Sequence, residues 1–168
     1  AVFHFPGGLK EYLEASIEGQ TRVTKEVFAG RIEKEGGHGS VEWATCWVAD
    51  EDGFLNSYCN TVPTPEGGTH ENGFRSALGK ALRDFGERVG NRKAAQITAD
   101  DVLGTAAAMF SVFIREPEFQ GQTKDKLATQ EASRIVENAV RDANHVIRLE
   151  AGRVVADAAA TLTATPVP

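Results

Sequence analysis

The chain has 168 residues, of which 41% are hydrophobic, and it carries a formal net charge of −6. This length allows one packed core and is too short for two ordinary domains with a linker. The acidic balance argues against a protein that coats nucleic acid over its whole surface, because phosphate binding needs a positive field; it leaves room for a local basic patch. No apolar run approaches the roughly 20 residues that a membrane span requires. We therefore expect a single cytoplasmic domain.

The two cysteines, Cys46 and Cys59, share no CxxC or Cys/His spacing of the kind that binds metal, and no stretch resembles a secretory signal. We expect both to be buried thiols, and we predict no metal site. The chain begins at Ala1 without an initiator Met, which suggests a piece of something longer.

The first half of the chain has the pattern of strands. Residues 22–32 mix apolar and charged residues as an edge-type strand does, and residues 41–48 alternate, with Trp43 and Trp47 on one face and Glu42 on the other. After a turn cluster at 50–53 the extended pattern resumes. We therefore predict an antiparallel hairpin of 41–48 with 54–62.

The second half alternates helices with a strand. Apolar residues recur at helical spacing over 74–89, and a short helix over 98–103 begins at the cap residue Thr98, with Asp101 where a capping box would prefer Glu. Residues 106–114 are β-branched and aromatic enough for a buried strand, and a second long helix begins near Thr129 and keeps its spacing through Ile147. The predicted fold class is α+β, a mixed sheet with helices packed on one face and a long C-terminal helix.

The polar loop at 117–127 leaves the buried strand and leads into the second long helix. The ammonium group of Lys124 can reach a terminal phosphate as a point charge, and the neighbouring Gln122 amide can donate to the same oxygens. The plainer interpretation is a solvated loop, and the spacing alone favours it.

Two other features have competing interpretations. His70 follows a Gly pair at a helix start and could act as a base, but a structural role is the better-supported interpretation. Basic residues make the first long helix and its exit locally positive, which fits a solvated helix face or a nucleic-acid contact. The members of this group considered DNA-facing are Arg83, Arg88, Arg92 and Lys93.

Two runs resemble signature stretches of the B (ATPase) subunits of the bacterial type II DNA topoisomerases, gyrase and topoisomerase IV. They are 66–70, followed by Gly73-Phe74-Arg75, and 121–127. The strand and loop at 110–119 and the segment 5–9 are also similar to that family. The resemblance covers residues 1 to 143. Two stretches look more like topoisomerase IV than gyrase, namely 60–64 and 43–47.

The resemblance implies a transducer domain over 21–150, preceded by a linker at 1–20. Beyond Gly152 the composition shifts to Ala, Thr and Val, so we expect a poorly ordered or appended tail at 151–168. The implied fold is that of the second domain of ribosomal small-subunit protein five, which contains an uncommon left-handed βαβ crossover. It also implies ATP-binding roles for Gln122, Thr123 and Lys124. Gln122 and Lys124 would contact the γ-phosphate, and Lys124 would act in catalysis by stabilising the charge that develops during hydrolysis.

Further implications concern the intact enzyme, which would relax or decatenate DNA. The implied partners are an upstream ATPase module of the same polypeptide, an A-type subunit, DNA and a second copy of the ATPase-bearing chain. ATP with Mg would be held in the full-length protein. The catalytic Glu, the Mg-binding Asn and the Gly-rich lid of the family have no counterpart here, so the segment alone is expected to be inactive, with no cofactor bound. The alternative is a stand-alone nucleic-acid-binding or partner-binding module with no ATP role.

Overall fold

The computed structural model describes residues 5–49, 52–143, 147–150 and 153–156. A five-stranded mixed sheet lies at its centre, with the strand order β1-β2-β5-β3-β4. All neighbouring strands are antiparallel except β3 and β5, which are parallel. The strands are β1 Phe28–Ile32, β2 Val41–Trp47, β3 Phe54–Cys59, β4 Val62–Pro63 and β5 Ala106–Val112.

The predicted hairpin of β2 with β3 is wrong, because β5 lies between these two strands. Six of the seven residues of β5 are buried, so this strand takes the central position, where both of its edges are paired. Strand β2 pairs with one edge, placing Trp43 opposite Phe110, and β3 pairs with the other, placing Phe54 opposite Ala107. The edge position predicted for residues 22–32 is confirmed for β1, although the strand proper begins only at Phe28.

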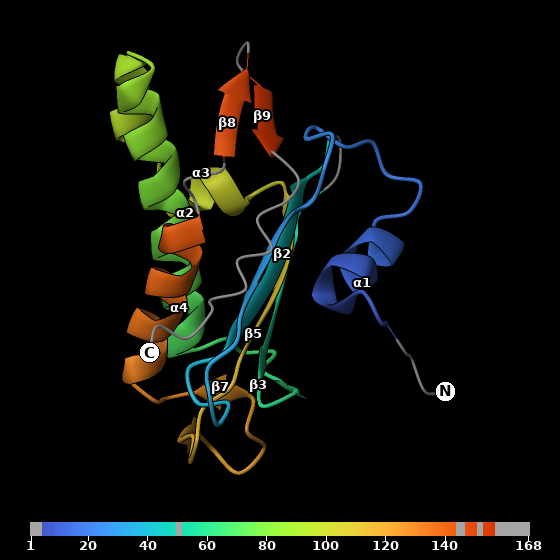
Figure 1. Cartoon of the computed structure of the whole chain (residues 1–168), viewed down its shortest axis with the longest axis vertical. Helices are drawn as coiled ribbons and strands as arrows, with labels where there is room; N and C mark the ends of the chain where they lie inside the picture. The colour runs from blue at the N-terminus through green and yellow to red at the C-terminus, as the bar shows by residue number, and fades with distance from the viewer. Residues whose placement is uncertain (1–4, 50–51, 144–146, 151–152, 157–168) are drawn as a thin grey trace.

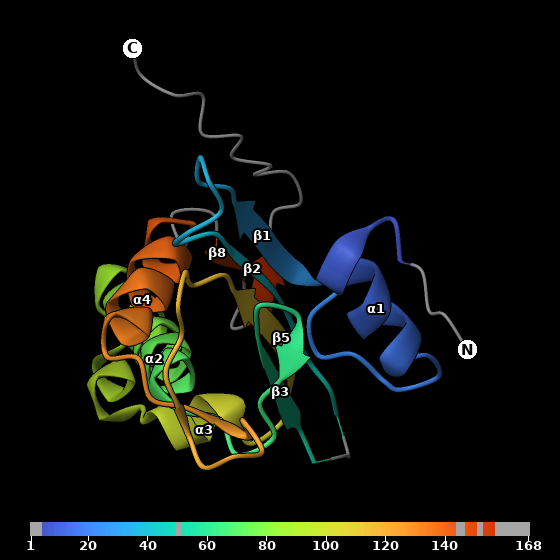
Figure 2. The same ribbon diagram turned by 90° about the horizontal axis from the view of Figure 1, so that it is seen from below.

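Three helices cover one face of the sheet (Figures 1 and 2). They are α2 Thr69–Arg88, α3 Ala99–Leu103 and α4 Glu131–Ala143, with a 3₁₀ turn, η1, at Arg92–Gln96. The Phe74 ring of α2 stacks on the Phe110 ring of β5, with centroids 4.7 Å apart. The predicted cap of α3 is confirmed, since Thr98 and Asp101 form a reciprocal capping box. Within the described residues, no helix is long and apolar enough to cross a membrane.

Helix α1, Gly8–Ser16, covers the opposite face (Figure 2), so the expectation of helices on one face only is wrong. Leu13 and Ile17 are fully buried there, in a cluster with small and sulfur-containing residues such as Cys46 and Met109. Apolar side chains line this second face of the sheet and need cover from water, which α1 supplies. The segment 1–20, expected to be a linker, thus contains a helix that packs on the sheet.

The long C-terminal helix is shorter than predicted. Helix α4 ends at Ala143, and β8 Ile147–Glu150 pairs antiparallel with β9 Arg153–Ala156. Ile147 keeps helical spacing from the preceding apolar residues, but the segment it begins is rich in β-branched residues, which favour strands. The rest of the predicted tail, apart from β9, lies outside the described residues.

Candidate functional site

The predicted polar loop is a β-hairpin. Strand β6 Phe119–Gln120 pairs antiparallel with β7 Lys126–Leu127, and the residues between them form an exposed tip. Gln122, Thr123 and Lys124 all lie in that tip. Figure 1 shows the hairpin at the lower end of the molecule, beyond the sheet. The structure therefore brings the three predicted ATP-binding residues together on one projecting turn.

Lys124 stands out in its backbone conformation and in the surroundings of its ammonium group. Its φ of 59° lies in the left-handed region, which is uncommon for a residue with a long side chain. Its Nζ atom lies 5.9 Å from the centroid of the Phe119 ring, within reach of a cation–π contact. Among the described residues, no carboxylate lies within 4.0 Å of this ammonium group. An exposed cation on a strained turn is therefore available to an anion from outside the domain.

The root of the hairpin is held by the residues that lead into α2, so the two signature runs meet in space. Glu66 N donates to Asp125 O at 2.9 Å, and Leu127 N donates to Gly67 O at 3.0 Å. Gly68 bridges to Leu127 as a parallel neighbour. A Cβ on Gly68 would lie 2.2 Å from the carbonyl oxygen of Leu127, and its φ of 136° also favours glycine. Gly68 thus allows the backbone of the hairpin to approach closely.

The start of α4 holds the other side of the root. The Thr129 hydroxyl accepts from Glu118 N at 2.8 Å, and Ala128 N donates to Glu118 O at 2.7 Å. The Thr69 hydroxyl donates to Thr129 O at 2.6 Å, and this bond joins the beginnings of α2 and α4. Leu127 is only 1% exposed. The hairpin therefore has a fixed root and an exposed tip.

His70 lies behind this root and is fully buried. Its Nε2 atom lies 2.9 Å from the Thr64 hydroxyl, which in turn lies 2.7 Å from the Ser57 hydroxyl. Within the described part of the chain, Nδ1 has no hydrogen-bond partner. Burial lowers the pKa of His70 to about 4, so the ring is neutral at neutral pH. This geometry supports the structural interpretation of His70 over a general base.

The sequence comparisons identify a family. The profile of the family described as "DNA gyrase B" matches residues 8–155. The chain belongs to this family. Among curated relatives, the DNA topoisomerase 4 B subunit of Caulobacter vibrioides is 56% identical over 146 residues, which cover 84% of this chain and 21% of the relative. Its counterpart from Bartonella bacilliformis is 54% identical over 141 residues, covering 84% and 20% respectively.

These relatives favour the resemblance to topoisomerase IV over that to gyrase. The chain spans about a fifth of the length of these relatives. A solved structure agrees with the fold. The 43K ATPase domain of Thermus thermophilus gyrase B, in complex with an aminocoumarin, superposes with a TM-score of 0.72 at 30% identity. The match covers 84% of this chain and 38% of the gyrase chain.

The basic residues of this gyrase B family member lie apart from the hairpin. Arg83 is half-buried and donates to Ile97 O at 2.8 Å, which ties α2 to the end of η1. Arg88, Arg92 and Lys93 are exposed near the C-terminal end of α2. Helix α2 has 20 residues and ends at Arg88, so Arg88 lies about 30 Å from the hairpin end of the helix. The structure therefore separates the predicted phosphate contact from the predicted DNA contact.

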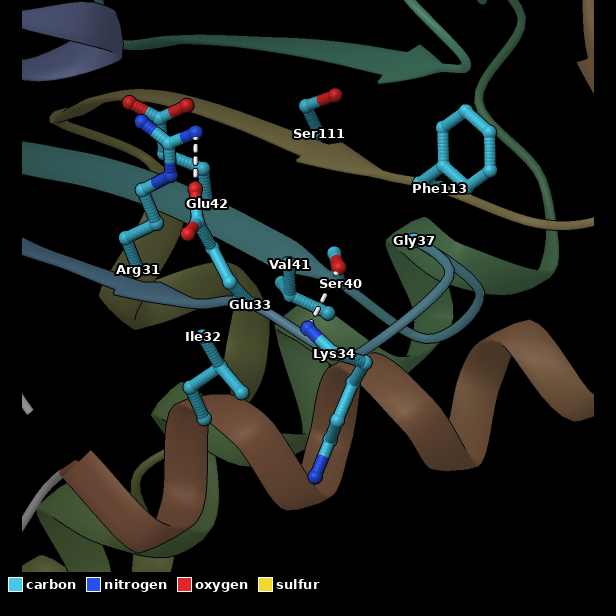
Figure 3. Close-up of a pocket in the computed structure, with 10 residues that line it drawn as sticks. All are labelled: Arg31, Ile32, Glu33, Lys34, Gly37, Ser40, Val41, Glu42, Ser111 and Phe113. Carbon is cyan, nitrogen blue, oxygen red and sulfur yellow. Dashed lines mark hydrogen bonds and ion pairs between the residues drawn. The ribbon is translucent and has the colours of Figure 1, made fainter. Parts of the chain in front are cut away.

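A hollow lined by residues of β1, β2 and β5, by the loop between β1 and β2, and by Phe113 contains none of the predicted site residues (Figure 3). Its walls carry both charges, and Arg31 pairs with Glu33 there. Within the described residues, no group of three or more His, Cys, Asp or Glu side chains is placed to hold a metal ion.

The residues missed by sequence reasoning are those that hold the hairpin root. The sequence presents Thr129 only as the start of a helix, and Asn60 only as part of a family-like run. The Asn60 side chain bonds Ile114, and the Thr129 carbonyl accepts from the Thr69 hydroxyl. Both contacts join segments more than 50 residues apart, for which a periodic pattern has no signal.

Proposed function

We propose that this chain is the transducer segment of a topoisomerase IV B-type subunit. In this proposal the hairpin tip contacts the γ-phosphate of ATP held by an ATPase module elsewhere in the same polypeptide, and it relays hydrolysis to domain movement. The observation that supports this role is the meeting of the two signature runs at an exposed, cationic tip with a fixed root. The intact enzyme, with an A-type subunit and a second B-type subunit, would relax or decatenate DNA.

The residues of the tip fit a phosphate. The Lys124 ammonium is exposed, with no carboxylate in ion-pair range among the described residues, and the exposed Gln122 amide can donate to the same oxygens. Lys124 would stabilise charge on the phosphoryl group, which is an electrostatic role and needs no proton transfer. Thr123 would position these two residues. Mg would arrive with the nucleotide, and the ATPase module would hold it.

The relay would pass from the root into the two helices that share it. Thr129 accepts a hydrogen bond from Glu118 and itself precedes α4, so a displaced hairpin pulls on the start of that helix. Such a segment, ordered by a γ-phosphate and released after hydrolysis, is a known kind of switch. We also propose that the parallel β3 and β5, joined through α2, form the left-handed crossover that the family resemblance implies.

The exposed Arg88, Arg92 and Lys93 support a secondary role in contacting DNA, because they form a local basic group on an acidic chain. Arg83 is a weaker candidate, since its guanidinium already bonds Ile97 O. A stand-alone nucleic-acid-binding module would show salt-dependent DNA affinity that depends on these residues and not on Lys124.

The test uses the full-length ATPase-bearing protein assembled with its A-type subunit. Lys124→Ala is expected to lower ATP turnover about a hundredfold, the scale found when one donor to a developing negative charge is removed. Lys25→Ala is the matched control, because Lys25 is also exposed and lies far from the hairpin. It follows Thr24, whose hydroxyl accepts from Trp47 N at the end of β2 that lies away from the exit of β5 into the hairpin. Unchanged ATP turnover and strand passage in Lys124→Ala would refute the proposed role.

A further inference from the structure

We infer that Asn60 is a positioning residue for the proposed phosphate contact, because its side-chain amide fixes the path of the chain from β5 into the hairpin. The inference rests on the proposed function. Asn60 Nδ2 donates to Ile114 O at 2.8 Å, and Ile114 N donates to Asn60 Oδ1 at 2.8 Å. A primary amide has one donor face and one acceptor face, so it pairs with a backbone segment as a second strand would.

This pairing continues the sheet after both strands have ended. Strand β3 ends at Cys59 and β5 ends at Val112. The backbone N of Asn60 donates to Val112 O at 3.0 Å, and its side chain then takes the next position, at Ile114. Ile114 is 1% exposed, so its peptide groups would otherwise be deprived of both water and a partner.

The conformation of Asn60 makes this reach feasible. Its φ is 50°, and that of Thr61 is 66°, so the chain turns sharply through the left-handed region at the end of β3. Asn tolerates that region better than most residues do. The turn points the amide back toward the exit of β5.

The pairing lies on the stretch of chain that runs from the end of β5 to β6, which is the first strand of the hairpin and is called its near side here. Arg115 N donates to His38 Nδ1 at 3.0 Å, and the next contact of this stretch with the root is Glu118 N to Thr129. The far side of the hairpin is fixed by Gly67 and by Glu66. Loss of the Asn60 pairing would remove the hydrogen bonds at Ile114 and leave this side of the root held only by the bonds on either side of it, while the Gly67 side stays in place. The strand would then be less well fixed where it leaves β5, and the tip would tilt.

The chemistry of the pairing sets the choice of variants. Asn60→Gly suits the left-handed backbone and removes both side-chain hydrogen bonds. Asn60→Asp keeps an acceptor for Ile114 N but loses the donor to Ile114 O, against which it places a carboxylate oxygen. Thr61→Gly is the matched control. It makes the same backbone more flexible at the neighbouring exposed position and leaves the amide pairing intact.

The experiment measures steady-state ATP turnover by the full-length protein assembled with its A-type subunit. Asn60→Gly is expected to lower kcat at least about tenfold, because a misplacement near 1 Å can cost up to a hundredfold. The KM for ATP should stay within about twofold, since the ATPase module supplies most of the binding. Thr61→Gly should match the wild type. Asn60→Asp should reproduce the loss, and it serves as the principal variant if Asn60→Gly melts too low to assay.

A double variant separates positioning from a general structural defect. If Asn60 acts through Lys124, then Asn60→Gly adds no further loss in the Lys124→Ala background. Losses that multiply would overturn the inference, because Asn60 would then act by another route. An unchanged kcat in both Asn60 variants, with Lys124→Ala still impaired, would overturn the inference and leave the proposed function standing. No effect of Lys124→Ala would overturn both.

Discussion

Gly73 lies where α2 crosses α4, and replacing it with Ala tests how closely the two helices approach. A Cβ at this position would lie 2.1 Å from the carbonyl oxygen of Ser133 and 3.0 Å from its Cα. Both are backbone atoms of α4, so no side chain can rotate away to make room. The helices would have to separate.

The magnitude follows from two opposing terms. Gly→Ala inside a helix gains about 1 kcal/mol from backbone entropy. Overpacking a fitted contact costs about 1–3 kcal/mol, and more where only the backbone can yield. Because only backbone can yield here, the upper part of that range applies, a cost of about 2–3 kcal/mol. After the gain of about 1 kcal/mol is subtracted, we expect Gly73→Ala to lower the free energy of unfolding by about 1–2 kcal/mol. Gly79→Ala is the matched control in the same helix, because its Cβ would meet Arg83 and Ala99 atoms no closer than 3.5 Å; it should gain about 0.5–1 kcal/mol.

The assay is urea unfolding of the chain followed by far-UV circular dichroism, with the m-value checked for each variant. The two substitutions are identical in chemistry and differ only in what faces the added methyl group. A Gly73→Ala variant as stable as the wild type would refute the close crossing of α2 and α4. A loss in Gly79→Ala would refute the entropic term.

Two further predictions concern buried titratable groups. Because burial lowers the pKa of His70 from 6.5 to about 4, the unfolded chain takes up the proton first as the pH falls. The stabilising contribution of His70 is thus complete above pH 6.5 and is lost between 6.5 and 4, in total about 3 kcal/mol. Urea unfolding at several pH values should show a flatter decline for His70→Gln than for the wild type or His38→Gln; equal slopes would contradict the assignment. Burial also raises the pKa of Cys59 to about 11, and Cys46 is buried too. Both thiols should therefore resist a disulfide reagent at pH 8 until denaturant is added, and rapid labelling of the folded chain would count against this packing.

Features carried by local pattern were predictable. The alternation of Trp43 with Glu42 correctly assigned the two faces of β2, since Trp43 is buried under α2 and α4 while Glu42 accepts a hydrogen bond from Leu9 N beneath α1. Thr98 and Asp101 identified the start of α3, because a cap is formed by residues three apart. The exposed position of Lys124 followed from a polar, Gly-containing loop between two apolar elements.

Features that depend on contacts between distant segments were not predictable. Residues 41–47 and 54–59 have the pattern of a hairpin, yet each pairs with β5, more than 45 residues further along the chain, because a strand buried on both faces needs two paired edges. The segment that forms α1 was expected to be a linker. Its apolar residues Leu13 and Ile17 are buried only because the second face of the sheet packs against them, and the sequence does not show that face. The same limit applies to the hairpin root.

Local residue order is thus enough to assign β2, α2, β5, the cap of α3 and the polar tip, since propensity and periodicity act over a few residues. Family resemblance adds a candidate role for Gln122, Thr123 and Lys124. The fold alone places Asn60 against Ile114 and Gly67 against Leu127. Those contacts join segments more than 50 residues apart, and they form only after the sheet has brought the ends of β3 and β5 together and α2 and α4 have packed across it.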